Sequence, residues 1–209
     1  MDGNIMQRRS IVVGGSTSIL AVGLTASSHN SSRRSGGASW YNSIPNVVVW
    51  AHDGRKYLFF DDLVRGHVVA INFMFAGCDG ICPLVTENLR RVQDLLGMRV
   101  GHDIFMYSIT LWPELETPDV LRAYAEQHEV GRGWLLLTGA PPDVEQLRRG
   151  LGFVGPDPER DVIADEHTGM LRFGNAALDR WAGTPALGRP EWIVKAITSS
   201  MGLPAHGRG

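Results

Sequence analysis

The sequence predicts an α/β fold in which one mixed central sheet is flanked by helices. Two observations carry this prediction. Stretches with strand character alternate with stretches of helical periodicity, and residues 68–75 are almost continuously apolar. Such a run is expected of a central strand that is buried on both faces of a sheet. The 209 residues, 44% of them hydrophobic and 20% charged, provide enough apolar side chains for one sizeable core, which excludes a disordered chain.

The first half of the domain is predicted to contain a hairpin, a buried strand and a helix. Residues 47–50 and 57–60 flank an Asp53-Gly54 turn and predict an N-terminal β-hairpin extension. The buried strand at 68–75 leads through a loop into a helix near Pro83. There the apolar side chains repeat at helical spacing, at Val85, Leu89, Val92 and Leu96.

The second half continues the alternation and ends with a hairpin and a helix. A strand at 103–110 precedes a helix to about residue 129, with Thr117 as N-cap and Pro118 at the first helical position. Further elements are a strand at 134–137, a helix at 142–151, a closing hairpin formed by 162–164 and 170–173, and a last helix at 191–201. No internal repeat or second domain is predicted.

Residues 1–38 are predicted to be an export leader and flexible linker, and residues 39–209 the folded domain. Arg8 and Arg9 precede an uncharged stretch at 10–26, the order of a signal peptide, and resemble a twin-arginine export signal. We therefore expect an exported, periplasmic or extracytoplasmic protein. The uncharged stretch is short and rich in Gly, Ser and Thr, so an uncleaved anchor stays the alternative, and it is the only membrane contact expected.

The charge distribution gives no indication of a nucleic-acid partner. The formal net charge is −2, and the 20 basic residues are scattered along the chain rather than grouped. Nucleic-acid binding requires a basic patch or stripe, so this class of partner is excluded.

The two cysteines, Cys78 and Cys82, are the candidate chemical site. They lie four residues apart where the buried strand gives way to a helix, and a helical turn would bring both thiols to one face. That geometry allows either a disulfide or a shared metal ion. A helix N-terminus favours thiolate, which is both the nucleophile and the metal ligand. A purely stabilising disulfide is less favoured, because a ring closed over so few residues constrains the unfolded chain little.

At this point the sequence resembles the Sco/SenC family. The resemblance rests on the stretch 71–75 leading into Cys78-Asp-Gly-Ile-Cys82-Pro83, on Ser108-Ile109-Thr110 with Thr117-Pro118, on residues 136–139, and on His167. It covers about three quarters of the chain. It implies a thioredoxin-like fold, and one copper ion held by Cys78, Cys82 and His167. It also implies a role in assembling the binuclear copper centre of cytochrome c oxidase, as metallochaperone or as thiol–disulfide reductase.

The residue types agree with copper. Two thiolates and one imidazole form a soft three-donor set that suits Cu(I) and also holds Cu(II), whereas a structural zinc site requires a fourth protein ligand. Taken alone, His167 in its acidic turn would more often be a solvated side chain, and the cysteine motif reverses that expectation. The partners implied are the copper-centre subunit of the oxidase or another copper client, and a copper-donor chaperone.

The sequence departs from the family after the strand that holds Ser108. Trp112-Pro113 replaces the usual Asp-Pro pair, and Glu116 stands where a second Asp is common. We expect the loss of carboxylates here to affect partner docking or redox tuning more than metal binding.

Two rival functions use the same two cysteines, which would then be a catalytic redox pair. One is a thiol–disulfide oxidoreductase, although thioredoxins use a C-x2-C motif and a cis-proline where this chain has His167. The other is a copper or redox sensor that signals through protein contacts, with Trp112 as its anchor. A peroxiredoxin is disfavoured, because the approach from Asn72 to Gly77 lacks that family's companion residues.

Overall fold

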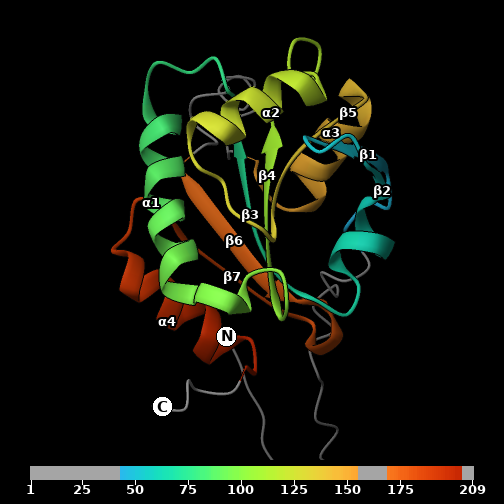
Figure 1. Ribbon diagram of the computed structural model, residues 1–209. Coiled ribbons are helices and arrows are strands. Elements are labelled where there is room, and N and C mark those ends of the chain that lie inside the picture. Colours follow the sequence, from blue (N-terminus) through green and yellow to red (C-terminus); the bar gives the residue numbers. More distant parts are fainter. Residues whose placement is uncertain (1–42, 155–168, 204–209) are drawn as a thin grey trace, which may run out of the picture. The chain divides into compact units, whose positions relative to one another are not determined.

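The computed structural model describes residues 43–154 and 169–203 and consists of one seven-stranded sheet with helices on both faces (Figure 1). The strands are β1 (Val48–Ala51), β2 (Lys56–Leu58), β3 (Val68–Met74), β4 (Ile104–Thr110), β5 (Trp134–Gly139), β6 (Met170–Asn175) and β7 (Arg180–Pro185). The α-helices are α1 (Ile81–Leu96), α2 (Pro118–Gln127), α3 (Pro141–Gly150) and α4 (Pro190–Ser200). Short helical turns are η2 (Phe59–Val64), η3 (Gly97–Arg99) and η5 (Ala176–Leu178).

The sheet is mixed, as the sequence predicts. Its strand order is β2-β1-β5-β4-β3-β6-β7. The three central strands β5, β4 and β3 are parallel, whereas β1 and β6 join them antiparallel. All seven residues of β3 are buried, which explains the continuous apolar run that predicts this strand.

The apolar core is divided by the sheet into two parts. One part is covered by α1, α2 and α4, of which α1 and α4 lie side by side, and it includes both cysteines (Figure 1). The other part is covered by η2 and α3. Helix α1 packs with the face predicted from its spacing, because Val85, Leu89, Val92 and Leu96 are all buried.

Buried polar side chains link the parallel strands at the centre of the sheet. Ser108 of β4 donates a hydrogen bond to the Asn72 side chain of β3 at 2.7 Å, and its hydroxyl oxygen accepts one from the Trp134 indole of β5 at 2.9 Å. A buried polar group that has no partner is costly, so this chain of bonds favours one register of the three strands.

The site of interest lies at the carboxyl ends of β3 and β4. The two strands are parallel and in register from Val68 and Ile104 to Met74 and Thr110, so they end at the same edge of the sheet. The loop after β3 carries the cysteine motif, and the loop after β4 carries Trp112 and Glu116. Open α/β sheets place their sites at such an edge.

Two predicted elements differ in the structure. Phe59 and Phe60, predicted as strand, begin the one-turn helix η2, in which both side chains are buried in the core. The closing hairpin is formed by β6 and β7 across η5, so the prediction that residues 162–164 supply its first strand lies outside the described residues. Strand β7 escapes the sequence pattern because none of its residues is fully buried.

Within the described residues, no helix is both long enough and apolar enough to cross a membrane.

Candidate metal centre

The two cysteines lie at the junction of β3 and α1. Cys78 is in the connecting loop, and Cys82 is the second residue of the helix. Both are in the thiol form, with no disulfide between them. Both cysteines are buried, Cys82 completely and Cys78 with 8% of the residue exposed.

The loop around Cys78 is held by backbone hydrogen bonds. The Cys78 N–H donates to the carbonyl of Phe75 at 3.3 Å, which closes a tight turn directly after the strand. The Gly80 N–H donates to Cys78 Sγ at 3.3 Å. Gly80 is also the N-cap of α1, so the sulfur of Cys78 lies against the N-terminus of a 16-residue helix. Backbone N–H groups at such a terminus favour a negatively charged atom.

The prediction that both cysteines lie on one helical turn is half right. Helix α1 begins at Ile81, so Cys82 is helical and Cys78 is not. Pro83 occupies the third position of the helix, within the first turn, where its missing N–H does not interrupt the hydrogen-bond ladder.

The surroundings of the cysteines are apolar and contain a tyrosine. Both cysteines belong to the part of the core covered by α1, α2 and α4. The hydroxyl groups of Tyr124 and Thr86 are hydrogen-bonded at 2.9 Å. Burial raises the pKa of Tyr124 to about 12, although the hydrogen bond to Thr86 opposes the shift. Tyr124 is therefore a neutral hydrogen-bonding group near the site.

Glu116 is the side chain whose place the sequence does not foretell. It is 4% exposed, and its Oε1 accepts hydrogen bonds from the N–H groups of Ala76 and Gly77, the latter at 3.2 Å. Its Oε2 accepts one from the hydroxyl of Thr110. Position 116 thus keeps a buried carboxylate, whereas position 112 carries an indole. The signal available in the sequence is an acidic residue just before the Thr117-Pro118 helix start.

Trp112 lies at the surface of the same edge. It is 50% exposed, and its ring meets that of Phe75 edge-on, with 6.1 Å between the ring centroids. Together with Leu111 and Glu114 these rings line a hollow of about 360 Å³. Trp112, at the position where the resemblance implies an Asp, therefore pairs with Phe75, which lies three residues before Cys78 in the chain.

His167, the third predicted ligand, lies outside the described residues. The chain is described again from Gly169, whose carbonyl accepts a hydrogen bond from the Ala186 N–H at 2.8 Å. A Cβ atom built on Gly169 would lie 3.9 Å from Cδ1 of Ile81, the first residue of α1. Gly169 thus lies beside Ile81, between the two cysteines of the motif in sequence.

Three further histidines of the described residues make contacts of their own. His52 is at the end of β1, where its ring Nδ1 accepts a hydrogen bond from the Leu136 N–H at 3.1 Å. His67 stacks on Phe105, and His128 stacks on Tyr124. In the described part of the chain, no three His, Cys, Asp or Glu side chains are arranged to hold a metal ion.

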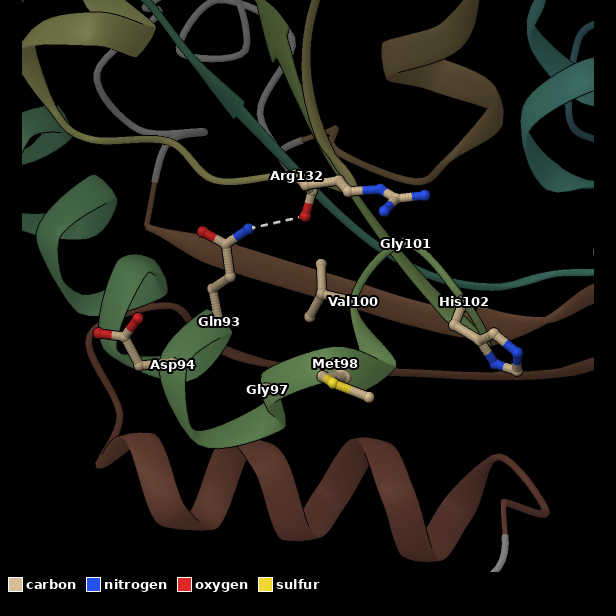
Figure 2. Close-up of a pocket in the computed structure, with 8 residues that line it drawn as sticks. All are labelled: Gln93, Asp94, Gly97, Met98, Val100, Gly101, His102 and Arg132. Atoms are coloured by element: carbon tan, nitrogen blue, oxygen red, sulfur yellow. Dashed lines mark hydrogen bonds between the residues drawn. The ribbon is translucent and has the colours of Figure 1, made fainter.

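A larger hollow, of about 610 Å³, lies at the other end of α1 (Figure 2). Figure 2 shows it between the last turn of α1 and the loop that leads into β4, with Met98 and His102 on one side and Arg132 on the other. Gln93 donates a hydrogen bond to the Arg132 carbonyl at 3.1 Å across it. None of the predicted ligands lines this hollow. It is therefore not a candidate for the metal centre, although it is larger than the hollow beside Trp112.

Comparison with known proteins identifies a family. A family model described as SCO1/SenC matches residues 51–171. A curated relative from Stutzerimonas stutzeri is 26% identical over 121 residues, which are 57% of this chain. The chain spans 58% of that relative's length.

Solved structures show the same fold. A SCO1/SenC family lipoprotein from Bacillus anthracis has a TM-score of 0.62 at 20% identity, over 75% of this chain and 94% of its own. Yeast Sco1 with copper bound has a TM-score of 0.59 at 18% identity, over 75% and 91%. BsSco, described as a Sco-family cytochrome c oxidase assembly protein with a disulfide switch, has 0.60 at 20%, over 76% and 92%.

Proposed function

Because the chain belongs to the SCO1/SenC family, a family with copper-bound members, we propose that it is an exported copper-binding protein that serves cytochrome c oxidase assembly. It would deliver copper to the binuclear copper centre of the oxidase, or keep the cysteines of that centre reduced. The observation that carries the proposal is the pair of free thiols at the β3–α1 junction, of which Cys78 is slightly less buried than Cys82.

The proposed ligands of the copper ion, one per chain, are Cys78, Cys82 and His167. The donor chemistry fits, because thiolate and imidazole are the ligands that Cu(I) prefers and that also hold Cu(II). The apolar surroundings of the two sulfur atoms keep competing water away from the metal. Copper here is cargo, so the site must release the ion as well as hold it, which three protein ligands favour over four.

The position of Gly169 supports His167 as the third ligand. Gly169 lies beside Ile81, the residue that precedes Cys82. Two residues of chain span at most about 7 Å, so His167 is within reach of the motif.

The alternative function is a thiol–disulfide reductase that acts on the cysteines of the client. The same two thiols serve it: the client's S–S bond breaks, an S–S bond forms between Cys78 and Cys82, and the two thiol hydrogens pass to the client sulfurs. The client is reduced and this chain is oxidised. The greater exposure of Cys78 makes it the attacking sulfur in this reaction.

One experiment separates delivery from reduction. The full-length chain, either loaded with copper or copper-free and reduced, is mixed with the soluble copper-centre domain of an oxidase whose cysteines are either reduced or disulfide-bonded. Delivery predicts that only the copper-loaded chain converts the reduced domain to its coloured binuclear form. Reduction predicts that the copper-free chain converts the disulfide-bonded domain to thiols. Failure of both reactions would overturn the proposed function.

The export proposal has its own test. Expression of the full chain with a reporter enzyme that is active only outside the cytoplasm should give activity, and replacing Arg8 and Arg9 by Lys should abolish it. Unchanged reporter activity in the double variant would contradict a twin-arginine route. A copper or redox sensor, the remaining alternative, would instead need a partner protein that binds differently to the copper-loaded chain.

A further inference from the structure

We propose that Glu116 is a positioning residue for the cysteine pair, which fixes the backbone ahead of Cys78 and thereby sets how readily Cys78 and Cys82 form a disulfide. The inference rests on the proposed function, in which the same two thiols carry the chemistry. It concerns the copper-free protein, so it can be tested separately.

The carboxylate of Glu116 bridges the two loops at this edge of the sheet. One oxygen accepts from the backbone N–H groups of Ala76 and Gly77, and the other accepts from the Thr110 hydroxyl at the end of β4. The Thr110 hydroxyl oxygen in turn accepts from the Trp112 N–H at 2.9 Å. A buried side chain with both oxygens occupied has little freedom, so the two loops are held at a fixed separation.

The two N–H groups belong to the residues directly before Cys78. The Cys78 N–H itself is taken by the Phe75 carbonyl, and the Gly80 N–H by the Cys78 sulfur. Among the described residues, the side chain that holds the Ala76–Gly77 segment of this turn comes from the loop after β4. Without Glu116, two partly buried N–H groups would lose their acceptor and the turn would be free to move.

The structure shows this arrangement with Cys78 and Cys82 as thiols. Cys78 lies in the loop before α1 and Cys82 in the first turn of the helix, so we infer that the loop, rather than the hydrogen-bonded helix, adjusts when a disulfide forms. The Glu116 bonds hold the loop in its dithiol position. Weakening them should therefore shift the equilibrium toward the disulfide.

Geometry and charge at position 116 can be separated by two substitutions. Glu116→Gln removes the charge but retains an oxygen at the same distance for the Ala76 and Gly77 N–H groups. Glu116→Asp retains the charge but is shorter by one methylene, so it cannot reach both N–H groups and Thr110 together. Glu114→Gln is the matched control. It makes the same chemical change two residues away, at a side chain that is exposed.

The measurement is the equilibrium of the copper-free, full-length chain with reduced and oxidised glutathione at pH 7. In the reaction the glutathione S–S bond breaks, the Cys78–Cys82 S–S bond forms, and the two thiol hydrogens pass to the glutathione sulfurs. The dithiol and disulfide forms are counted by mass after alkylation. We expect Glu116→Asp to shift the equilibrium constant about fivefold to tenfold toward the disulfide. Glu116→Gln and Glu114→Gln should stay within about twofold of wild type.

Two results would overturn the inference: no shift in Glu116→Asp, or a larger shift in Glu116→Gln than in Glu116→Asp, which would assign the effect to charge. Copper binding by the wild-type chain is measured alongside. If the wild type binds copper and Glu116→Asp causes no shift, only this inference fails. If Glu116→Asp shifts the equilibrium but the wild type binds no copper, the proposed function fails and the role of Glu116 stands.

Discussion

The backbone N–H of Gly80 donates a hydrogen bond to the sulfur of Cys78, with 3.3 Å between the two atoms. The bond holds Cys78 at the rim of the site, 8% exposed, while Cys82 is wholly buried in the core. The two thiols of one motif therefore differ in their burial.

Cys78 should react before Cys82. With the copper-free, reduced protein at pH 7, iodoacetamide should modify Cys78 at least about tenfold faster, because alkylation requires access to the sulfur. The rates are measured by quenching at intervals and counting labelled peptides by mass spectrometry. Equal rates in the native protein, together with equal rates in urea, would show that the burial difference has no influence.

Substitutions of Thr86 and Tyr124 should have non-additive effects on the free energy of unfolding. Thr86→Val removes the buried partner of the Tyr124 hydroxyl and should lower the free energy of unfolding by about 1 to 2 kcal/mol. Tyr124→Phe should cost a similar amount. The double variant should be less destabilised than the sum of the two, since the second substitution removes a bond already lost. Urea unfolding of all four proteins measures this, and strict additivity would mean that the two hydroxyl groups do not interact.

His52 should make the protein less stable in mild acid. Burial lowers the pKa of His52 below its ordinary value of 6.5, although the charge of Asp53 opposes the shift. The unfolded chain therefore takes up the proton first, and stability is lost as the pH falls through 6.5 toward the lower pKa of the folded state.

The matched variant is His52→Gln, which offers the Leu136 N–H an oxygen and does not titrate. Its free energy of unfolding should fall less between pH 7.5 and pH 5.5 than that of the wild type. An identical fall in both proteins would assign the acid sensitivity to other groups.

Gly133 should be far less replaceable than Gly66, although both have a positive φ. A Cβ atom on Gly133 (φ +82°) would lie 2.3 Å from the backbone nitrogen of Gly101, whereas one on Gly66 (φ +78°) would meet nothing within 4 Å. Gly66→Ala should cost about 1 kcal/mol from its backbone conformation alone. Gly133→Ala should cost about 3 kcal/mol or more, because two backbone segments must separate. Thermal unfolding compares the two, and similar costs would contradict the close approach.

The sequence predicts most of the fold because its central elements are strongly patterned. The apolar run at 68–75 predicts β3 because it is too short for a buried helix, and the spacing of Val85 to Leu96 predicts α1 because it fits the helical period. Strand β7 and the turn η2 were missed, because the first is only half-buried and the second is a short apolar run that suits a strand equally well.

The site was predictable only in part, because a local motif is visible in the sequence and a contact between distant residues is not. The spacing of the two cysteines is visible in the sequence. The contact between Glu116 and the N–H groups of Ala76 and Gly77 is not, because it joins residues about 40 positions apart. The sequence around a single acidic residue does not indicate whether its side chain is buried. That contact depends on β3 and β4 ending in register at Met74 and Thr110, which only the assembled sheet reveals.

The central claim is that Cys78, Cys82 and His167 bind one copper ion, and anaerobic copper titration of the reduced, full-length chain tests it most directly. The account predicts one Cu(I) per chain and, with Cu(II), a thiolate-to-copper charge-transfer band. Cys78→Ser and Cys82→Ser should each abolish tight binding, while His167→Ala should retain much of the Cu(I) affinity and lose stable Cu(II). Full and equal copper binding by all three variants would contradict the site.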